Sequence, residues 1–585
     1  MPKALLIYGE NPVTFWSYDE TLEIIGKKST FTPNPLLSVA GMLPGNYDVR
    51  LVDENVERLT DKHLEWADFY MASGMIIHKK SIENIIKRTN EAGKPLMVGG
   101  PLPSQYHDKI NGYATYFLGE AENAGFLEAL EDMVRRGYRK ENKVIDVRDP
   151  KHFTDINKAP LQRFDLIRDK LDDYFATSLQ ITRGCPEPCI YCDIPIMYGK
   201  KTRIKNINKV IEELDALYDI GWRGMLMFVD DNLAGNQEEI KPILKEISRW
   251  QEERGYPFRF VTQASLRIYD DEEFLETMYT AGFAQVFFGV ESPSKESLKA
   301  MGAQKNIHAS NERGKKSMLD KIKDMQANYF RAKAGFILGF DEDPDNIADL
   351  MKEFIQESRI GVAMVGPLGV LPGTPLYKKF EREGRLVKDV MYDGGSGLMT
   401  RKLSYVPMKN GQRIDPNIIL DQHRDVLEFI NKPENYFARN LEYFKHRKRK
   451  PLARMPASVD AIKSLVNSLY VQGMKSDYRK EYFNFLGQVV KNDPMDIGEA
   501  VASAIVGHHL ITATTESLKV DDVSVSLEMI LREKGEAIRD MGHEIIRGIS
   551  EKYNSIKDNF KASVDEKYRK IIDEITNNRN LATNS

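Results

Sequence analysis

The stretch Arg183-Gly184-Cys185-Pro186-Glu187-Pro188-Cys189-Ile190-Tyr191-Cys192-Asp193 contains all three cysteines of this 585-residue chain. Their C-x3-C-x2-C spacing allows the three thiols to converge on one object. A disulfide would leave one cysteine over, and structural zinc usually takes four protein ligands. Three thiolates fit a [4Fe–4S] cluster with one open iron, because cysteine thiolates hold such clusters. Zinc and incidental thiols are the alternatives.

Before the cysteines, short apolar runs alternate with stretches of helical periodicity. The expected strands are Lys3–Tyr8, Asp48–Val52, Phe69–Gly74, Pro95–Gly99 and Ala114–Leu118. This alternation predicts a doubly wound, Rossmann-like parallel sheet that binds ligands at the carboxyl ends of its strands. Three of these ends are small or glycine-rich, which lets a large ligand approach the backbone closely. Tight turns without a ligand are the alternative.

The cysteine loop follows the first of six further apolar runs. These expected strands are Phe175–Ile181, Met225–Val229, Phe258–Thr262, Ala284–Gly289, Ala334–Leu338 and Val362–Val365. Six parallel strands with polar residues at most of their exits predict a partial TIM-like barrel, in which the chemistry lies at the carboxyl ends. Later in the chain the pattern becomes helical, at 415–430, 433–446, 458–473, 480–491 and from about 494 to 577.

These patterns predict an α/β fold in three parts: a Rossmann-like domain at 1–150, a partial (β/α)6 barrel at 151–390 and an α-helical domain at 391–585. Met391–Gly397 is expected to be a glycine-rich linker or loop. The net charge of −4 gives no reason to expect nucleic acid as a partner. Free thiols without an export signal indicate a reducing cytoplasm. The sequence contains no apolar run of about 18 residues, so no membrane span is predicted.

Residues 183–193 resemble the signature of the radical SAM superfamily, in which an aromatic residue such as Tyr191 precedes the third cysteine. This resemblance implies that Cys185, Cys189 and Cys192 hold the cluster and that its open iron chelates S-adenosylmethionine (SAM). The segments Val98–Pro101 and Leu118–Glu122 resemble landmarks of the cobalamin-binding domain in cobalamin-dependent radical SAM proteins. The helical C-terminal part and the start of the chain resemble the hopanoid C2-methylase subgroup.

The resemblance also implies where SAM binds. Asp230-Asp231-Asn232 stands where the family more commonly has Gly-Gly-Glu, which meets the methionyl amino group. Glu291 occupies the position of a ribose contact. The expected SAM contacts are Tyr191, Asp230, Asp231, Asn232, Gln263, Ser265, Glu291 and Ile337, with Arg267 as a further candidate, and no catalytic residue is assigned. The alternatives are a helix cap for Asp231 and an ion pair with a surface lysine for Glu291.

For cobalamin, the resemblance implies contacts at the three strand ends of the Rossmann-like domain, namely Ser73, Gly74, Gly99, Gly100, Gly119 and Glu120. The D-x-H-x-x-G motif, which supplies a lower axial histidine in many cobalamin proteins, is missing after the first strand. Gly9-Glu10-Asn11-Pro12 stands there instead, and His63, in a partial match, falls in an expected helix. We therefore expect base-off cobalamin with no protein histidine on cobalt.

Together these resemblances imply a cobalamin-dependent radical SAM enzyme that methylates an unactivated carbon of a hydrophobic small molecule, such as a terpenoid or another lipid. An electron donor such as ferredoxin or flavodoxin is the expected partner. The basic run Lys445–Lys450 is either a solvated helix end or a contact with anionic headgroups, which would make the cytoplasmic protein peripheral to the inner membrane surface. Two other functions stay open: a related enzyme that cyclises, couples carbons or oxidises without methylating, and a non-enzymatic zinc or sensor protein.

Overall fold

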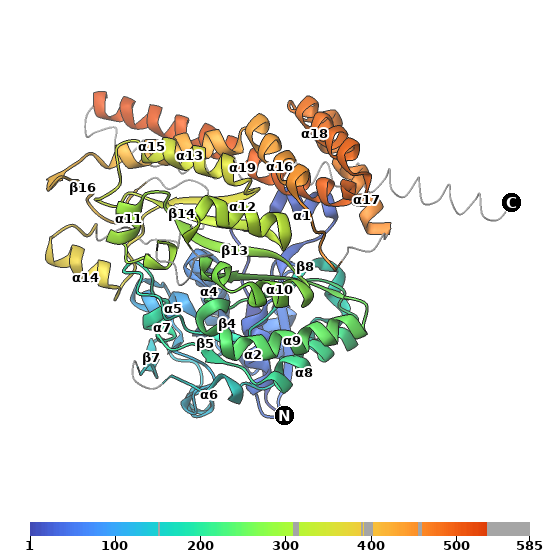
Figure 1. The fold of residues 1–585 in the computed structure, drawn as a ribbon. Helices are drawn as coiled ribbons and strands as arrows, with labels where there is room; N and C mark the ends of the chain where they lie inside the picture. The colour runs from blue at the N-terminus through green and yellow to red at the C-terminus, as the bar shows by residue number, and fades with distance from the viewer. Residues whose placement is uncertain (150–152, 308–314, 388–389, 391–401, 454–458, 535–585) are drawn as a thin grey trace. The chain divides into compact units, whose positions relative to one another are not determined.

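The computed structural model describes residues 1–149, 153–307, 315–387, 390, 402–453 and 459–534 (Figure 1). Residues 1–514 form one compact unit, and residues 515–585 form a second. The expected linker at 391–397 lies outside the described residues. The domain boundaries after residues 150 and 390 stay predictions. No helix in the described ranges combines the length and the apolar character needed to cross a bilayer.

The first sheet has six parallel strands in the order β3-β1-β4-β5-β6-β7. They are β1 (Lys3–Tyr8), β3 (Asp48–Asp53), β4 (Phe69–Ser73), β5 (Leu96–Gly99), β6 (Thr115–Leu118) and β7 (Lys143–Asp146). The first five confirm the predicted strands, whereas the polar edge strand β7 was not predicted. Because β1 lies between β3 and β4, the strand order reverses beside it, and doubly wound sheets bind their ligands at such a switch point.

Amphipathic helices connect these strands. They are α2 (Asn34–Met42), α3 (Asp61–Trp66), α4 (Lys79–Glu91), α5 (Pro101–Tyr106) and α6 (Gly125–Arg136). The helix α4 shows why they form, because Ile82, Ile85, Ile86 and Thr89 repeat at helical spacing and are all buried. The helix α2 contacts β1 and β4 of the first sheet and β8 of the second. One hydrophobic core is therefore continuous from the first sheet to the second.

The second sheet is a curled parallel half-barrel with the order β15-β14-β13-β12-β11-β8-β2. Its strands are β8 (Tyr174–Leu179), β11 (Gly224–Phe228), β12 (Phe258–Ala264), β13 (Phe283–Glu291), β14 (Arg331–Leu338), β15 (Val362–Pro367) and β2 (Ser29–Phe31). The first six confirm the predicted barrel strands. The strand β2 is an addition from the N-terminal part of the chain, and it pairs Ser29 with Tyr174 and Phe31 with Ala176.

Helices cover the outer face of the half-barrel (Figure 1). They include α8 (Ile207–Asp219), α9 (Gln237–Glu253), α10 (Glu272–Thr280), α12 (Met318–Asn328) and α13 (Ile347–Ser358), and the shorter α7 (Ile194–Met197), α11 (Lys295–Ala300) and α14 (Pro375–Arg382) lie in the loops. On β14, Ala332, Ala334 and Leu338 are fully buried under this layer. Lys333, Gly335 and Ile337 alternate with them on the inner face and stay partly exposed.

The C-terminal part is helical, as predicted. It comprises α15 (Pro416–Asn431), α16 (Pro433–His446), α17 (Val459–Ser468), α18 (Arg479–Asn492) and α19 (Ile497–Lys534), with a small hairpin of β16 (Met408–Lys409) and β17 (Gln412–Arg413) before them. The helix expected over 458–473 ends at Ser468, and Leu469–Lys475 is a π-helix. The helix α1 (Asp19–Ile25) packs here, where Thr21 donates to the carbonyl of Ile505 at 3.2 Å.

Candidate active site

The three cysteines lie in a loop that leaves the carboxyl end of β8. The short strands β9 (Thr182–Arg183) and β10 (Arg203–Ile204) pair in antiparallel fashion and close the loop at its base. Cys189 is buried, Cys185 and Cys192 are partly exposed, and all three are free thiols. No group of three or more His, Cys, Asp or Glu residues in the described part of the chain surrounds a single ion. A [4Fe–4S] cluster makes no such demand, since each thiolate binds a different iron.

The triplet Asp230–Asn232 directly follows β11 and forms hydrogen bonds with the base of this loop. Asp230 is fully buried and accepts the backbone N–H groups of Ile181 at 2.9 Å and Thr182 at 2.5 Å. Asp231 accepts the N–H of Gly184 at 2.7 Å. Burial raises the pKa of Asp230 to about 7 and that of Asp231 to about 6, although the backbone donors oppose the shift. Both carboxylates thus hold the residues just before Cys185.

Asn232 connects the triplet to a cysteine. Its Nδ2 donates to Cys185 Sγ at 3.7 Å, and its Oδ1 accepts the N–H groups of Ala234 and Ser265. An amide that donates to a cluster thiolate stabilises the negative charge on sulfur, and hydrogen bonds to the sulfurs help to set the reduction potential of such clusters. The sequence indicated that this triplet belongs to the site, and the structure shows it in direct support of the loop. Its contacts with SAM stay predictions.

At the end of β13, Glu291 has a backbone φ of 68°, in the left-handed region that costs non-glycine residues energy. Its side chain is 10% exposed, and Lys305 Nζ lies 3.4 Å from its Oε1. Burial acts to lower the pKa of Lys305, but Glu291, Cys189 and Cys185 outweigh it and raise the pKa. The partner of Glu291 is thus a lysine with 12% side-chain exposure near the cysteines, and not the surface lysine of the alternative interpretation. Sequence reasoning missed Lys305.

The other expected SAM contacts lie on the same side of the half-barrel. Tyr191 packs edge-on against Phe340 with ring centroids 6.0 Å apart, and burial followed by Glu291 raises its pKa. Gln263 and Ile337 are partly exposed on the inner face. Ser265 Oγ is buried without a hydrogen-bond partner in the described structure. By contrast, Arg267 is half exposed and pairs with Glu187 at 3.5 Å.

The predicted cobalamin contacts lie at the carboxyl ends of β4, β5 and β6. Gly100 has a φ of +96°, and a Cβ there would lie 2.8 Å from Ser73 Oγ and 3.0 Å from the carbonyl oxygen of Gly74, so the backbones of these two loops lie close together. Beside them, Val13 and Met75 are large apolar side chains with 53% and 49% exposure. This edge therefore presents close-packed backbone and uncovered apolar surface, which suits the flat face of a macrocycle.

Two histidines near this edge are already engaged. His78 Nδ1 accepts the N–H of Met75 at 3.0 Å, and its Nε2 lies 2.9 Å from Asn11 Oδ1. Burial lowers the pKa of His78 to about 4, so the ring is neutral and donates through Nε2. His63 Nδ1 accepts the N–H of Thr60 and caps the start of α3.

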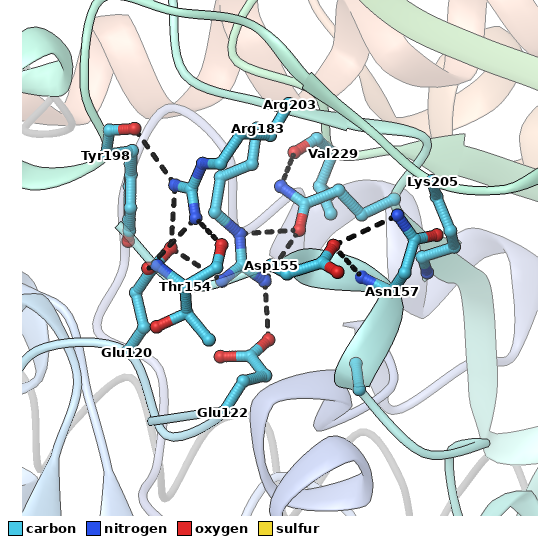
Figure 2. A network of polar contacts seen from close by, with 12 residues as sticks. Glu120, Glu122, Thr154, Asp155, Asn157, Arg183, Tyr198, Arg203, Lys205 and Val229 are labelled. Atoms are coloured by element: carbon cyan, nitrogen blue, oxygen red, sulfur yellow. Dashed lines mark hydrogen bonds and ion pairs between the residues drawn. The ribbon is translucent and has the colours of Figure 1, made fainter. Parts of the chain in front are cut away.

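Ion pairs tie the first sheet to the cysteine loop (Figure 2). Glu120 follows β6, and its carboxylate lies 2.9 Å from an Nη of Arg183 and 2.7 Å from an Nη of Arg203. Glu122 pairs with Arg183 at 2.8 Å. All four side chains are buried to more than four-fifths, because their exposure is 7% for each glutamate, 17% for Arg183 and 14% for Arg203.

Glu120 was expected at a cobalamin-contacting strand end, and the structure places its carboxylate against these arginines. Burial acts to raise the pKa of Glu120, but the bonds and charges of Arg203 and Arg183 hold it below its usual range. A second tie lies beyond the cysteines, where Gln105 of α5 donates to Asp193. The loop is thus fastened to the first sheet two residues before Cys185 and one residue after Cys192. Long-range pairing of this kind has no local sequence pattern.

Comparison with known families agrees with this geometry. The radical SAM superfamily model matches residues 179–354, and a domain of unknown function (DUF4070) matches residues 374–521. An uncharacterized methyltransferase of Synechocystis sp. is 32% identical over 92% of this chain and 94% of its own length. The hopanoid C-2 methylase of Rhodopseudomonas palustris is 27% identical over 91% of this chain and 97% of its own length.

Two solved structures share the fold. The radical SAM methyltransferase TsrM from Kitasatospora setae, with cobalamin and a [4Fe–4S] cluster bound, has a TM-score of 0.50 and 12% identity, and the match covers 85% of this chain and all of that one. The cobalamin-dependent radical SAM enzyme OxsB, with aqua-cobalamin and SAM bound, has a TM-score of 0.52 and 14% identity over 91% of this chain and 81% of that one.

A half-barrel with a three-cysteine loop, joined to a doubly wound sheet, defines a radical SAM enzyme with a cobalamin-binding domain. The chain belongs to the radical SAM methyltransferases, and the hopanoid C-2 methylase of Rhodopseudomonas palustris is among its relatives. Its cofactors are a [4Fe–4S] cluster, SAM and cobalamin. The residues present fit them, with three free thiols for the cluster and an exposed apolar strand edge for cobalamin. The zinc or sensor interpretation does not agree with this membership.

Proposed function

We propose that this enzyme transfers a methyl group to an unactivated carbon of a hydrophobic small molecule, of terpenoid or other lipid character. The near full-length likeness to hopanoid C-2 methylase supports this substrate class. When bound, the cluster supplies the electron that cleaves SAM to a radical, and cobalamin supplies the methyl group. The observation that carries the proposal is the fastening of the cysteine loop to the carboxyl edge of the first sheet, since methyl transfer needs both cofactors at one substrate.

In this proposal the residues of the chain bind and position. Cys185, Cys189 and Cys192 hold the cluster, while Asp230 and Asp231 fix the backbone that leads into Cys185. Because Asp230 is fully buried beneath the loop, the partly exposed Asp231 is the better placed of the two to meet the amino group of SAM. Tyr191, Asn232, Gln263, Ser265, Glu291 and Ile337 complete the proposed SAM surface.

The proposed cobalamin surface is formed by Ser73, Gly74, Gly99, Gly100 and Gly119, with Glu120 acting through its arginines. No histidine is placed on cobalt, because both ring nitrogens of His78 already have partners and His63 caps a helix. This supports base-off binding.

The inner face of the half-barrel supports a hydrophobic substrate. Met227, Phe287 and Met364 point inward from alternate strands and are partly exposed, whereas their neighbours Leu226, Phe288 and Val365 on the outer face are buried. Trp16, from the segment between β1 and α1, packs against Phe287 with ring centroids 5.6 Å apart. Apolar side chains that stay exposed inside a fold usually mark a binding surface.

The basic run Lys445–Lys450 is largely used inside the protein. Arg447 is 3% exposed and pairs with Asp496 and Glu499, while Arg449 pairs with Glu276 and Lys450 with Asp493. These contacts favour a structural role over attraction to anionic headgroups, so membrane contact through this run is not part of the proposal. An external electron donor such as ferredoxin or flavodoxin remains part of it.

The proposal is tested with the enzyme reconstituted under anaerobic conditions with iron, sulfide and cobalamin. It is incubated with a reductant, SAM carrying a trideuterated methyl group, and a lipid extract of its source cells. We expect one extracted compound to gain the trideuteromethyl group as 5′-deoxyadenosine forms. Formation of 5′-deoxyadenosine and a modified compound without the label would instead identify a non-methylating cyclisation, coupling or oxidation.

A further inference from the structure

The inner face of β14 carries two cations that have no carboxylate partner among the described residues. Strand register places Lys333 beside Phe287 of β13, which in turn lies beside Gln263 of β12. Arg331 lies two residues earlier on the same face, beside Gln285. The hydrogen bonds of Arg331 go to the neutral side chains of Ser503 and Asn440. Within the described residues, the ammonium of Lys333 makes neither a hydrogen bond nor an ion pair.

The surroundings of Lys333 are aromatic and positive. Its Nζ lies 6.0 Å from the centroid of the Tyr18 ring. Burial, followed by the charges of Arg331 and Arg259, lowers the pKa of Lys333 to about 8. Of these three cations, only Arg259 pairs with a carboxylate in the described part of the chain, with Glu499 at 3.1 Å. The side chain of Lys333 is partly exposed on the inner face, so its ammonium is accessible to a ligand there and has no counter-charge among the described residues.

Polar atoms without partners lie around the same place. Tyr18 Oη and His509 Nε2 are both buried and have no hydrogen-bond partner in the described structure, and their rings are 5.3 Å apart, whereas His509 Nδ1 pairs with the Glu20 carboxylate. Tyr18 also adopts a left-handed φ of 54°. Most buried polar groups in proteins are satisfied, so a hydroxyl, an imidazole nitrogen and an ammonium left without partners together point to a missing polar ligand.

The proposed SAM surface lies farther along the same strand, toward its carboxyl end. The next inward row above Lys333 and Phe287 contains Gly335 and Gly289, and a Cβ would lie 3.0 Å from the Phe287 ring at Gly335 and 2.3 Å from Glu291 Oε1 at Gly289. Ile337, a proposed SAM contact, lies four residues beyond Lys333, which is about 13 Å along a strand. A molecule anchored at Lys333 therefore passes the Phe287 ring and Glu291 before it reaches the carboxyl edge of the strand.

We propose that Lys333 and Tyr18 bind an anionic group, a carboxylate or a phosphate, of the methyl-accepting substrate. This inference rests on the proposed function and narrows its substrate class to an amphiphile whose apolar body lies along Phe287 and Met364. The anion accepts charge-assisted hydrogen bonds from the ammonium and the hydroxyl, which are stronger than neutral ones. A neutral hydrocarbon would leave both groups unsatisfied.

The first experiment uses the holoenzyme, trideuteromethyl SAM and the extract of source cells. After reaction, the extract is separated on an anion exchanger at neutral pH. We expect the labelled product to be retained, and treatment with alkaline phosphatase then distinguishes a phosphate, which is released, from a carboxylate, which is not. A labelled product that flows through as a neutral compound overturns this inference alone. The absence of label from every fraction while 5′-deoxyadenosine forms overturns the proposed function as well.

The second experiment compares Lys333→Met with Lys333→Arg, using the purified acceptor from the first. Loss of a charge-assisted hydrogen bond should raise the apparent KM for the acceptor about 10- to 100-fold in Lys333→Met, and Lys333→Arg should restore most of it. Lys463→Met is the matched control, because Lys463 is 65% exposed on α17. The Tm of Lys333→Met should not fall, since the ammonium has no ion-pair partner among the described residues to lose. An unchanged KM in Lys333→Met overturns the inference.

Discussion

Removal of the Arg183 guanidinium tests whether the buried ion pairs couple the first sheet to the cysteine loop. Arg183→Met keeps most of the apolar stem and deletes both contacts, at 2.9 Å to Glu120 and 2.8 Å to Glu122. Glu120 retains Arg203 at 2.7 Å. Among the described residues Glu122 keeps no other cation within ion-pair distance. The variant therefore leaves one carboxylate that is 7% exposed without a counter-charge.

The size of the effect follows from this burial. Breaking a buried ion pair by removing one partner costs about 3–5 kcal/mol, because the remaining charge stays desolvated. We expect the lower end, about 3 kcal/mol, since Arg203 still neutralises Glu120. Arg163→Met is the matched control: Arg163 pairs with Asp165 at 2.7 Å, but the two side chains are 41% and 50% exposed. An exposed pair of this kind contributes about 0–1 kcal/mol.

Two measurements check the reasoning on reconstituted protein. The first is urea denaturation, followed by circular dichroism and by loss of the cluster absorbance. The double variant Arg183→Met, Glu122→Gln should recover part of the lost stability, because it removes the unpaired charge. The second is the ratio of 5′-deoxyadenosine to methylated product. We expect this ratio to rise roughly tenfold or more, since small misplacements of reacting groups cost up to about 100-fold in rate.

The coupling role would be refuted by a variant that resembles the Arg163→Met control in stability and keeps the wild-type ratio of the two products. A loss of stability with an unchanged ratio would leave Arg183 as a purely structural residue. Only a change in both quantities shows that the ion pairs set the position of the loop for methyl transfer.

Three further predictions concern the loop itself. The pKa of Asp230 is about 7 in the folded state, against an ordinary value of 3.8, so the fold disfavours the ionised carboxylate. The folded state is therefore most stable below about pH 4, where the carboxyl group is protonated. It should lose about 4 kcal/mol of stability as the pH rises to about 7. Asp230→Asn should remove this pH dependence, and calorimetry at about pH 5 and about pH 8 measures it. Asn232→Asp deletes the amide donor to Cys185 but keeps the oxygen that caps the next turn, and it should make the cluster potential more negative in a redox titration followed by electron paramagnetic resonance. Cys192→Ser should abolish iron retention and SAM cleavage, with far-ultraviolet circular dichroism unchanged.

Local patterns were sufficient to predict most strands of both sheets. An apolar run such as Leu5–Ile7 or Leu226–Phe228, closed by polar or glycine residues, has the length and composition of a buried parallel strand. The strands that were missed lack this pattern. The strand β2 has only three residues, and β7 alternates between exposed and half-exposed positions at the sheet edge. Their strand conformation depends on pairing with β8 and β6, which a local window does not contain.

The residues of the site also fall into those that a local sequence pattern predicts and those that it does not. The cysteines and the Asp230–Asn232 triplet could be found because each lies directly after a strand, where residues near in sequence are also near in space. Lys305 could not, because its approach to Glu291 depends on the turn after α11. The pairing of Glu120 with Arg183 joins residues separated by 63 positions. Neither of these two ion pairs corresponds to a residue spacing that could be recognised in the sequence.

The segment from Phe15 to Phe31 has a consequence for how the polypeptide is made. Its residue Thr21 bonds to Ile505, 484 positions later, and β2 pairs with a strand that follows more than a hundred residues afterwards. At about 5–20 residues per second, the ribosome needs on the order of a minute to supply those partners. Until then Phe15 lacks its partners in the C-terminal helices. This N-terminal segment therefore completes its packing only late in synthesis, after the barrel strands have been made.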